Sequence, residues 1–396
     1  MACHFSIRKS DNNSKVNGSL SLQLFLNGRG GMALDSQAQA RHKKKSCAAG
    51  GGPCVGREAT GVVRGRRAWI ISDGKAGHEI QMLGVAEALG VACEVKRIAD
   101  PGAISKLTAP YGRPPRAARF GAPGGSFAPP WPDIAFATGR LTTPYIRALK
   151  RKAGLKTFTV ILLDPKTGPR SADLFWVPEH DVRRGANVVT TLTSPHLYGP
   201  ARLAKLRADV PAAIAALPHP RVAVLIGGPN GDYRYGPGDL TRLTRALGGL
   251  ADSGAGLMIT ASRRTPPDLL DAIDQATATA HRILWRGEGD NPYPHFLAHA
   301  DAFLVTADSV NMVGEAAATG KPIHVFHPEG GSPKFDRFHA ALHAKGITRA
   351  LASPFVLETW SYAPLDSART IADEIERRYL ARMRMIPGLC ESGGRK

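Results

Sequence analysis

The stretch from 67 to 90, RAWIISDGKAGHEIQMLGVAEALG, decides the fold. It opens with an apolar run, 68–72, that stops at an Asp-Gly pair, which is typical of a strand buried in a parallel sheet. After a loop of small residues, apolar side chains recur at helical spacing over 79–89, and Gly90 is a common helix stop. A second strand is expected at 92–98. The stretch therefore predicts the β-loop-α-β opening of a doubly wound α/β lobe.

The same alternation of short β-type runs and helical spacing continues along the chain. Further strands are expected at 133–138, 157–163, 174–177, 187–191, 222–226, 256–260, 281–285, 302–306 and 323–326, and further helices at 144–153, 237–250, 267–280, 309–319 and 367–380. Alternating strands and helices predict parallel sheets with right-handed crossovers. We therefore expect an α/β protein of two doubly wound lobes with a cleft between them.

The length of 396 residues exceeds what one hydrophobic core usually supports, which also favours two lobes. The predicted division is a basic extension at 1–66, a first Rossmann-like lobe at 67–200, a second at 201–365, and a C-terminal helix and tail at 366–396. The extension is interpreted as a disordered segment or a mis-assigned start; an organelle transit peptide is the alternative, disfavoured by the lack of arginine periodicity. Residues 100–132 are rich in Pro, Gly and Arg without periodicity and predict a long surface loop.

The formal net charge of +19 is unevenly distributed along the chain. Residues 1–67 contain 12 Lys and Arg against 3 Asp and Glu, whereas the remainder contains 40 against 30. The net charge therefore does not indicate a nucleic-acid partner, and the basic run 41–45 lacks the interleaved aromatic side chains of such a site. The mild basicity of the remainder suits phosphate-bearing or anionic-membrane ligands.

Cysteine spacing argues against a zinc-binding protein, and hydropathy argues against a membrane-spanning one. The five cysteines, at 3, 47, 54, 93 and 390, form no pair or Cys/His cluster with zinc spacing. No stretch approaches the length of a transmembrane span. We expect a reducing compartment, no structural metal and no cofactor.

The loop after the first strand, SDGKAGHE at 72–79, is the first candidate site, because ligands of open parallel sheets gather outside the carboxyl ends of the strands. Its candidate residues are Gly74, Lys75 and Gly77 for binding an anion, and His78 and Asp73 for proton transfer. The glycines allow close approach of the backbone, and the helix N-terminus presents unpaired N–H groups. A helix cap with a solvent-facing histidine is the structural alternative, and spacing alone does not decide between them.

Three loops of the second lobe also follow predicted strands. Their candidate binding residues are Gly227, Gly228, Pro229 and Asn230 in the first loop, Ser262, Arg263, Arg264 and Thr265 in the second, and Asp308, Ser309, Asn311, Met312 and Glu315 in the third. Paired arginines offer forked donors for phosphate oxygens, hydroxyls and amides at a helix start bind diphosphates, and the glutamate could accept from ribose hydroxyls. Each loop alone is explained as well by a tight turn, a solvated basic turn or a helix cap, but the three together favour a ligand site.

Two other features are weaker candidates for a ligand site. Asp164 either contributes to the cleft or only terminates its strand. In the stretch 291–294, Tyr293 could stack on a base, although a rigid turn is favoured there.

Six strings of the sequence resemble one known family, in order and with little gap over about 67–380. They are ISDGKAGHEIQMLGVAEALG at 71–90, WPDIAFATGR at 131–140, LLDPK at 162–166, LIGGPNG at 225–231, TASRRTP at 260–266 and TADSVNMVGEAAATGKPIHVF at 306–326. The family is the elongated-mitochondria family, named for a plant mitochondrial-fission factor and represented by many bacterial proteins. The DGKAGH and TADSVNM strings are specific, whereas the glycine loop by itself is not.

The resemblance implies a GT-B-like fold of two Rossmann-like lobes, with a nucleotide-diphosphate sugar donor on the second lobe and the acceptor and catalytic base on the first, near residues 73–78. It implies a glycosyltransferase that acts on a lipid- or envelope-linked acceptor, in the cytoplasm or peripherally on the inner membrane. The absence of a clear carboxylate-pair motif further predicts that this enzyme is metal-independent. A nucleotide-sugar epimerase on the same fold is one alternative. A non-catalytic adaptor is another, because the plant member recruits a dynamin-like GTPase.

Overall fold

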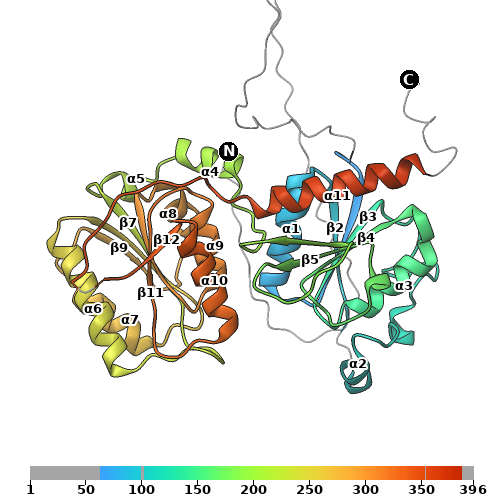
Figure 1. Ribbon diagram of the computed structural model, residues 1–396, viewed down its shortest axis with the longest axis horizontal. Coiled ribbons are helices and arrows are strands. Elements are labelled where there is room, and N and C mark those ends of the chain that lie inside the picture. Colours follow the sequence, from blue (N-terminus) through green and yellow to red (C-terminus); the bar gives the residue numbers. More distant parts are fainter. Residues whose placement is uncertain (1–62, 100–101, 353, 386–396) are drawn as a thin grey trace, which may run out of the picture. The chain divides into compact units, whose positions relative to one another are not determined.

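The computed structural model describes residues 63–99, 102–352 and 354–385. It contains two six-stranded sheets, all of whose strand pairs are parallel, with helices on both faces (Figure 1). The prediction of two doubly wound, Rossmann-like lobes is therefore confirmed. The tail at 386–396 and the extension up to residue 62 lie outside the described residues. Val63 is described and is buried in the core of the first lobe.

The first sheet has the strand order β2-β1-β3-β4-β5-β6. Its strands are β1 (Arg67–Ser72), β2 (Ala92–Arg97), β3 (Ile134–Thr138), β4 (Phe158–Leu162), β5 (Leu174–Pro178) and β6 (Val188–Thr191). Every residue of β3, β4 and β5 is buried, which explains why these strands read as continuous apolar runs rather than as alternating ones.

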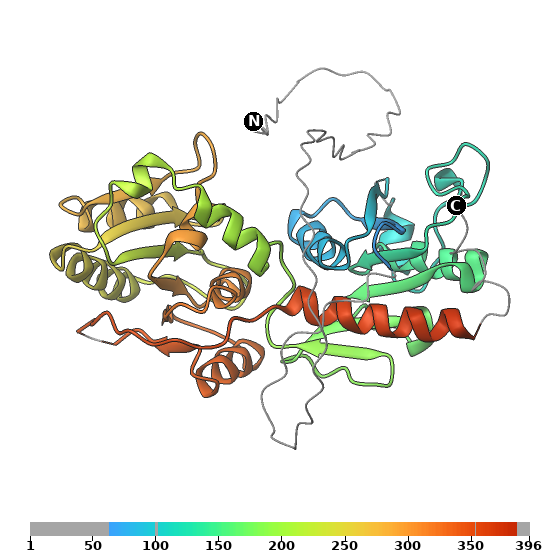
Figure 2. The same ribbon diagram turned by 90° about the horizontal axis from the view of Figure 1, so that it is seen from above.

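Helices α1 (Ala76–Leu89) and α11 (Ser367–Arg384) cover one face of this sheet, and α3 (Thr143–Ala153) covers the other (Figures 1 and 2). Alternate residues of β1 serve the two faces: Ile70 packs in the cluster with α1 and α11, and Ile71 in the cluster with α3. Arg369 of α11 donates to the carbonyl oxygen of Ala88 at 2.7 Å. The C-terminal helix thus completes the first lobe.

Residues 100–132 do not form the plain surface loop that was predicted. The described part of this segment contains helix α2 (Ala103–Thr108) and the 3-10 turn η1 (Arg116–Ala118); two further 3-10 turns follow, η2 (Gly154–Lys156) and η3 (Pro169–Ser171). The rings of Phe120 and Phe127 stack with centroids 5.4 Å apart, and Trp131 meets Trp69 of β1 at 5.9 Å. The prediction was wrong because aromatic residues spaced without periodicity give no strand or helix signal, although they cover the sheet here.

The second sheet has the strand order β12-β11-β10-β7-β8-β9. Its strands are β7 (Arg221–Ile226), β8 (Gly256–Ala261), β9 (Arg282–Trp285), β10 (Ala302–Thr306), β11 (Ile323–Phe326) and β12 (Thr348–Ala350). Helices α6 (Pro237–Asp252) and α7 (Pro267–Ala276) pack on one face, while α8 (Tyr293–His299), α9 (Val310–Ala317) and α10 (Pro333–Ala344) pack on the other. The lobes are joined through α4 (Pro200–Ala208) and α5 (Ala212–Ala215).

Several of these elements differ from the sequence predictions. Helices α4, α5, α8 and α10 and strand β12 were not expected, and α7 ends at Ala276 rather than at 280. The stretch 291–294, interpreted as a rigid turn, instead opens α8, with Pro292 at the N-cap position. A proline in the first turn fits a helix start as well as a turn, because its fixed φ suits both.

Candidate functional site

In both sheets the candidate loops follow strands at the point where the strand order reverses. The chain runs from β1 to its neighbour β2 and then continues from β3 on the other side of β1. In the second sheet it runs through β7, β8 and β9 and then restarts with β10 on the other side of β7. Open parallel sheets bind ligands outside the carboxyl ends of their strands at such a reversal. The loops there are 72–79 after β1, 227–232 after β7 and 307–309 after β10.

Asp73 and His78 form a hydrogen-bonded pair at the end of β1. The Nδ1 atom of His78 lies 3.1 Å from Oδ1 of Asp73, and the ammonium of Lys75 lies 3.3 Å from the other carboxylate oxygen. Burial by itself raises the pKa of Asp73, but His78 and Lys75 together hold it below its ordinary value. The Asp73 side chain is 4% exposed and that of His78 21%. A carboxylate on Nδ1 leaves Nε2 as the proton acceptor, so Asp73 orients the ring and His78 is the group placed for proton transfer.

The alternative of a helix cap at this loop is not observed. Helix α1 begins at Ala76, with Lys75 at the N-cap position and no side-chain cap. The hydroxyl of Ser72 instead donates to Oε1 of Glu79 at 2.6 Å. The first N–H groups of α1 therefore keep their capacity to bind an anion.

Glycines of the first lobe shape the space around His78. Gly74 has φ of +81° and Gly139, after β3, has φ of +86°, a conformation that favours glycine. A Cβ on Gly139 would lie 3.2 Å from Cε1 of His78, so a side chain there would crowd the ring. A Cβ on Gly77 would meet nothing within 4 Å, which leaves open space beside the start of α1.

The three second-lobe loops meet around the carboxylate of Asp308, which is fully buried. It accepts from the backbone N–H of Gly228 at 2.9 Å, the hydroxyl of Tyr235 at 2.6 Å and the guanidinium of Arg264 at 3.1 Å. The amide of Asn230 donates to the backbone carbonyl of Asp308 at 3.3 Å. Asp308 thus binds the loops to one another, and its oxygens are occupied by protein donors.

Gly227 and Gly228 are required by this close packing of the loops. A Cβ on Gly227 would lie 2.1 Å from the Asp308 carboxylate, and one on Gly228 would lie 2.2 Å from the carbonyl oxygen of Arg264. The Gly227 N–H donates to the hydroxyl of Thr306 at 2.8 Å. The two glycines therefore have a structural reason that is independent of any ligand.

The two arginines of the second loop differ in their surroundings. Arg264 donates to the carbonyl oxygens of Gly228 and Pro229, at 2.8 and 3.2 Å, in addition to its ion pair. Ser262 and Thr265 bond within the loop: the Ser262 N–H donates to Oγ1 of Thr265 at 2.9 Å. Arg263 is exposed, and its guanidinium has no acceptor within the described part of the chain. Arg263 alone of the pair is available to a phosphate.

Helix α9 begins at the reversal point of the second sheet. Ser309 is at the N-cap position without a side-chain cap, and Asn311 is exposed. Met312 packs against the core of the second lobe, so its predicted contact with a ligand competes with a structural role.

Glu315, on the next turn of α9, is a partly buried acid. Its carboxylate accepts from the hydroxyl of Tyr293, at the start of α8. Burial raises the pKa of Glu315 to about 7, although the Tyr293 hydroxyl lowers it. The group therefore changes charge near neutral pH.

A small cavity of about 40 Å³ is lined by residues of helix α1 in the first lobe and helix α9 in the second. Its walls are Gly77, Ile80 and Gln81 of α1, Ser194, Pro195 and His196 after β6, and Asn311 and Glu315 of α9. Two buried atoms in these walls, Oε1 of Gln81 and Nε2 of His196, have no hydrogen-bond partner among the described residues. Burial lowers the pKa of His196 to about 4, so its ring is neutral at pH 7.

His196 and Gln81 were missed by the sequence predictions. His196 lies between elements with no motif around it, and Gln81 reads as an ordinary polar position of an amphipathic helix. Only the fold brings them to one cavity.

Asp164 is not brought into this cavity or to the second-lobe loops by any contact in the described chain. Its Oδ1 accepts from Arg183 and from the backbone N–H of Lys166, both at 2.8 Å. These bonds hold the turn after β4, and they lower the pKa of Asp164 against the opposing effect of burial.

Two further observations concern metal ions and membranes. Over residues 63–99, 102–352 and 354–385, no cluster of three or more His, Cys, Asp or Glu side chains is arranged to hold a metal ion. In the same residues no helix combines the length and apolarity needed to cross a membrane.

Solved structures with a similar arrangement include MurG and a UDP-GlcNAc 2-epimerase. MurG of Acinetobacter baumannii is 15% identical, with a TM-score of 0.43 over 80% of this chain and 91% of its own. The UDP-GlcNAc 2-epimerase of Methanocaldococcus jannaschii is 10% identical, with a TM-score of 0.47 over 80% of this chain and 99% of its own. Both scores lie below 0.5, and the fold assignment rests on the sheet topology described above.

Sequence relatives are more informative. The mitochondrial fission protein ELM1 of Arabidopsis thaliana is 31% identical over 276 residues, which are 63% of this chain and 65% of that protein. An uncharacterized protein of Rickettsia prowazekii is 33% identical over 162 residues, 39% of this chain and 45% of the relative. The matches thus span less than two thirds of each relative. The family described as mitochondrial fission ELM1 matches residues 76–379, and the chain belongs to that family.

Proposed function

We propose that this protein binds a nucleotide-diphosphate sugar at the second-lobe loops and transfers the sugar to a hydroxyl-bearing acceptor held against the first lobe. The observation that carries the proposal is the position of the motif loops at the strand-order reversals of both sheets. The fold alone does not specify a reaction, so the argument rests on the groups at these loops.

The start of α9 and Arg263 supply the donors for a diphosphate. The N–H groups of residues 310–312 have no acceptor within the described chain, because the first turn of a helix has no preceding carbonyls and Ser309 gives no side-chain cap. Such N–H groups carry a partial positive charge and favour phosphate oxygens. The exposed guanidinium of Arg263 adds a forked cation, so together these groups would neutralise a leaving diphosphate.

The small cavity is lined by a candidate donor and a candidate acceptor for a hydroxyl group, although the His196 ring also interacts with the backbone of Gly314. Nδ1 of His196 accepts the N–H of Tyr198 at 3.1 Å, so the neutral ring carries its proton on Nε2 as a donor. Gln81 Oε1 is the matching acceptor. Leaving the buried Gln81 oxygen unpaired costs about 1–3 kcal/mol, which an entering sugar hydroxyl would remove.

The proposed reaction needs one base and one leaving group. Nε2 of His78 would take the proton of the acceptor hydroxyl as its oxygen bonds to the anomeric carbon of the sugar. The bond from that carbon to the diphosphate oxygen breaks, and its electron pair leaves with the nucleoside diphosphate. Asp73 stabilises the imidazolium that forms. The acceptor class that the family resemblance suggests is lipid-linked or cell-envelope material.

The test is calorimetric titration of the full chain with UDP-, GDP- and CMP-linked sugars. At least one should bind saturably. Arg263→Ala should weaken that binding about tenfold or more, since a hydrogen bond to a charged group contributes about 1.5–3 kcal/mol. Arg245→Ala, an exposed arginine on α6, is the matched control and should bind as the wild type does.

His78→Ala then separates binding from chemistry. It should abolish sugar transfer with donor affinity nearly intact, because the base acts on the acceptor. A fully active His78→Ala protein would remove the assigned base. Absence of binding to all three donor classes would overturn the proposal and favour the adaptor alternative.

A further inference from the structure

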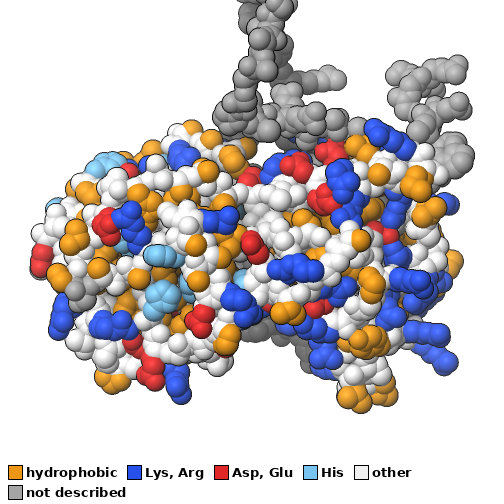
Figure 3. All heavy atoms as spheres, viewed as in Figure 1, with side chains coloured by type: hydrophobic (Ala, Val, Ile, Leu, Met, Phe, Trp, Pro, Cys, Tyr) orange, Lys and Arg blue, Asp and Glu red, His pale blue; other side chains and the backbone are white. Residues whose placement is uncertain are grey.

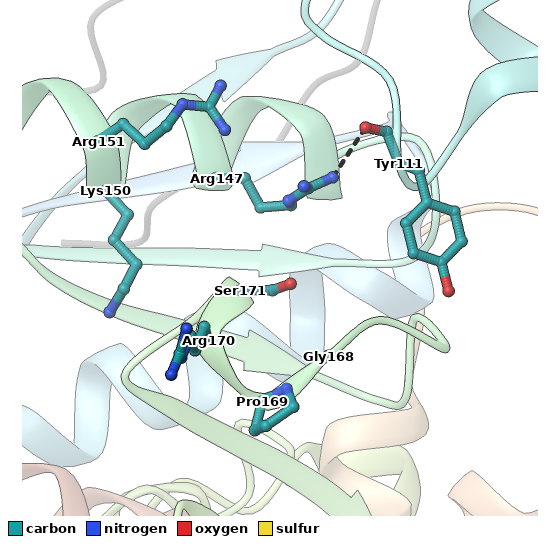
Figure 4. A pocket seen from close by; sticks show the side chains of 8 residues that line it. All are labelled: Tyr111, Arg147, Lys150, Arg151, Gly168, Pro169, Arg170 and Ser171. Carbon is teal, nitrogen blue, oxygen red and sulfur yellow. Dashed lines mark hydrogen bonds between the residues drawn. The ribbon is translucent and has the colours of Figure 1, made fainter.

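A separate groove of about 600 Å³ lies on the first lobe. It is lined by Tyr111, Arg147, Lys150, Arg151, Gly168, Pro169, Arg170 and Ser171 (Figure 4). It shares no residue with the small cavity or the second-lobe loops. Its volume is in the range of small-ligand sites.

The groove exists because one crossover of the first lobe lacks a helix. Between β3 and β4 the chain forms the 11-residue helix α3, whereas between β4 and β5 it forms only the three-residue turn η3. A helix would normally cover the sheet at that place. The short crossover leaves a depression beside α3, with Arg147, Lys150 and Arg151 on one wall and Arg170 on the other (Figure 4).

The lining carries four cations and no carboxylate. Arg147 is held by the carbonyl oxygens of Pro110 and Tyr111, at 3.1 and 2.9 Å, and Lys150 pairs with Asp173. Asp173 also pairs with Arg382 at 2.6 Å, so this one acid does not offset the cations around it.

Arg151 and Arg170 are exposed, and neither guanidinium has an acceptor among the described residues. Both side chains belong to the lining of the groove, and their unneutralised charges make its surroundings attractive to an anion. Guanidinium forks match phosphate oxygens in geometry as well as in charge. In the space-filling view, Lys and Arg side chains gather over the side of the first lobe where α3 lies (Figures 1 and 3).

We propose that this groove is a second binding site of the protein, for a phosphate-bearing anion. The anion has two sources, a soluble phosphate compound or the headgroup of an anionic lipid. Helix α2, joined to the groove through Tyr111, exposes Ile104 and Leu107 by 80% and 84%. Apolar side chains next to a basic groove are an arrangement that meets a lipid surface, which makes the lipid arm of the test informative.

The experiment compares the full-length wild type with Arg151→Ala/Arg170→Ala. One arm titrates inorganic pyrophosphate by calorimetry. The other measures co-sedimentation with vesicles of phosphatidylcholine containing phosphatidylglycerol, against phosphatidylcholine alone. The matched control is Arg245→Ala/Lys345→Ala, which removes two exposed cations from the second lobe. Thermal unfolding by circular dichroism checks that all variants are folded.

The wild type should bind in at least one arm, and the groove variant should bind there about tenfold more weakly or worse, with the control unchanged. Binding to pyrophosphate identifies a soluble ligand, and binding only to phosphatidylglycerol vesicles identifies a lipid headgroup. The proposal is overturned if neither arm shows binding, if the groove variant binds like the wild type, or if the control loses as much as the groove variant. If pyrophosphate binds only at the second-lobe loops, the groove variant binds it as the wild type does, and the proposal is overturned.

Discussion

Glu315 should make the stability of the protein fall as the pH rises from about 4.5 to about 7. Its pKa is raised by burial from 4.5 to about 7, and one pKa unit corresponds to about 1.36 kcal/mol. The shift thus amounts to about 3 kcal/mol. Below pH 4.5 the carboxyl is neutral in the folded and unfolded chains, and its contribution to stability is fully present. As the pH rises from 4.5 to about 7 the unfolded chain ionises while the folded chain stays protonated, so this contribution is lost over that interval and no more is lost above it.

The perturbation that isolates this effect is Glu315→Gln, which keeps an oxygen that can accept from Tyr293 and removes the titration. Urea unfolding from pH 4.5 to 8.5 should show wild type and variant of similar stability at the acid end. At pH 8 the variant should be more stable by up to about 3 kcal/mol. The control is Glu288→Gln, at an exposed site, whose stability should follow the wild type at every pH.

The reasoning is refuted if the difference between wild type and Glu315→Gln is constant across this range. Titration of other groups changes both proteins equally, so only the difference counts. A constant difference would mean that the Glu315 carboxyl is as well solvated in the folded protein as in the unfolded chain.

Two other stability predictions follow from single contacts. On helix α1, Gly77→Ala should leave the unfolding temperature unchanged or slightly higher, because the added Cβ meets nothing and alanine favours a helix. Gly84→Ala should instead lower the free energy of unfolding by about 1–3 kcal/mol, because the added Cβ would lie 2.4 Å from the carbonyl oxygen of His196. Thermal melts of the pair decide this, and equal losses would contradict it. Asp308→Ala should cost at least about 2 kcal/mol in urea unfolding, since the buried donors of Gly228 and the tyrosine at 235 lose their acceptor. A loss below about 0.5 kcal/mol would show that these bonds do not organise the loops.

The sequence predicted the strands well where burial on both faces imposes an uninterrupted apolar run. The expected strands at 302–306 and 323–326 coincide with β10 and β11. The alternating order of strands and helices predicted parallel sheets. Parallel sheets in turn place the candidate loops at the carboxyl ends of the strands. The prediction failed at 100–132, because Phe120 and Phe127 stack across a loop without any period.

The candidate site was predictable at the level of loops and not of individual roles. Spacing could not show that Arg264 is committed to Asp308 while Arg263 is free, because that depends on which loop packs against which. It could not find His196, whose role depends on a helix more than a hundred residues away in sequence. Asp73 and His78 belong to the same candidate loop, so the sequence alone predicted both as proton-transfer residues.

The central claim is that the first turn of α9 and Arg263 bind the diphosphate of a nucleotide sugar. Hydrogen exchange of the full chain, with and without a saturating nucleotide-diphosphate sugar, tests it most directly. We predict slower exchange at the amides of 310–312, with the amides of η3 unchanged. A ligand that binds without protecting residues 310–312 would contradict the claim.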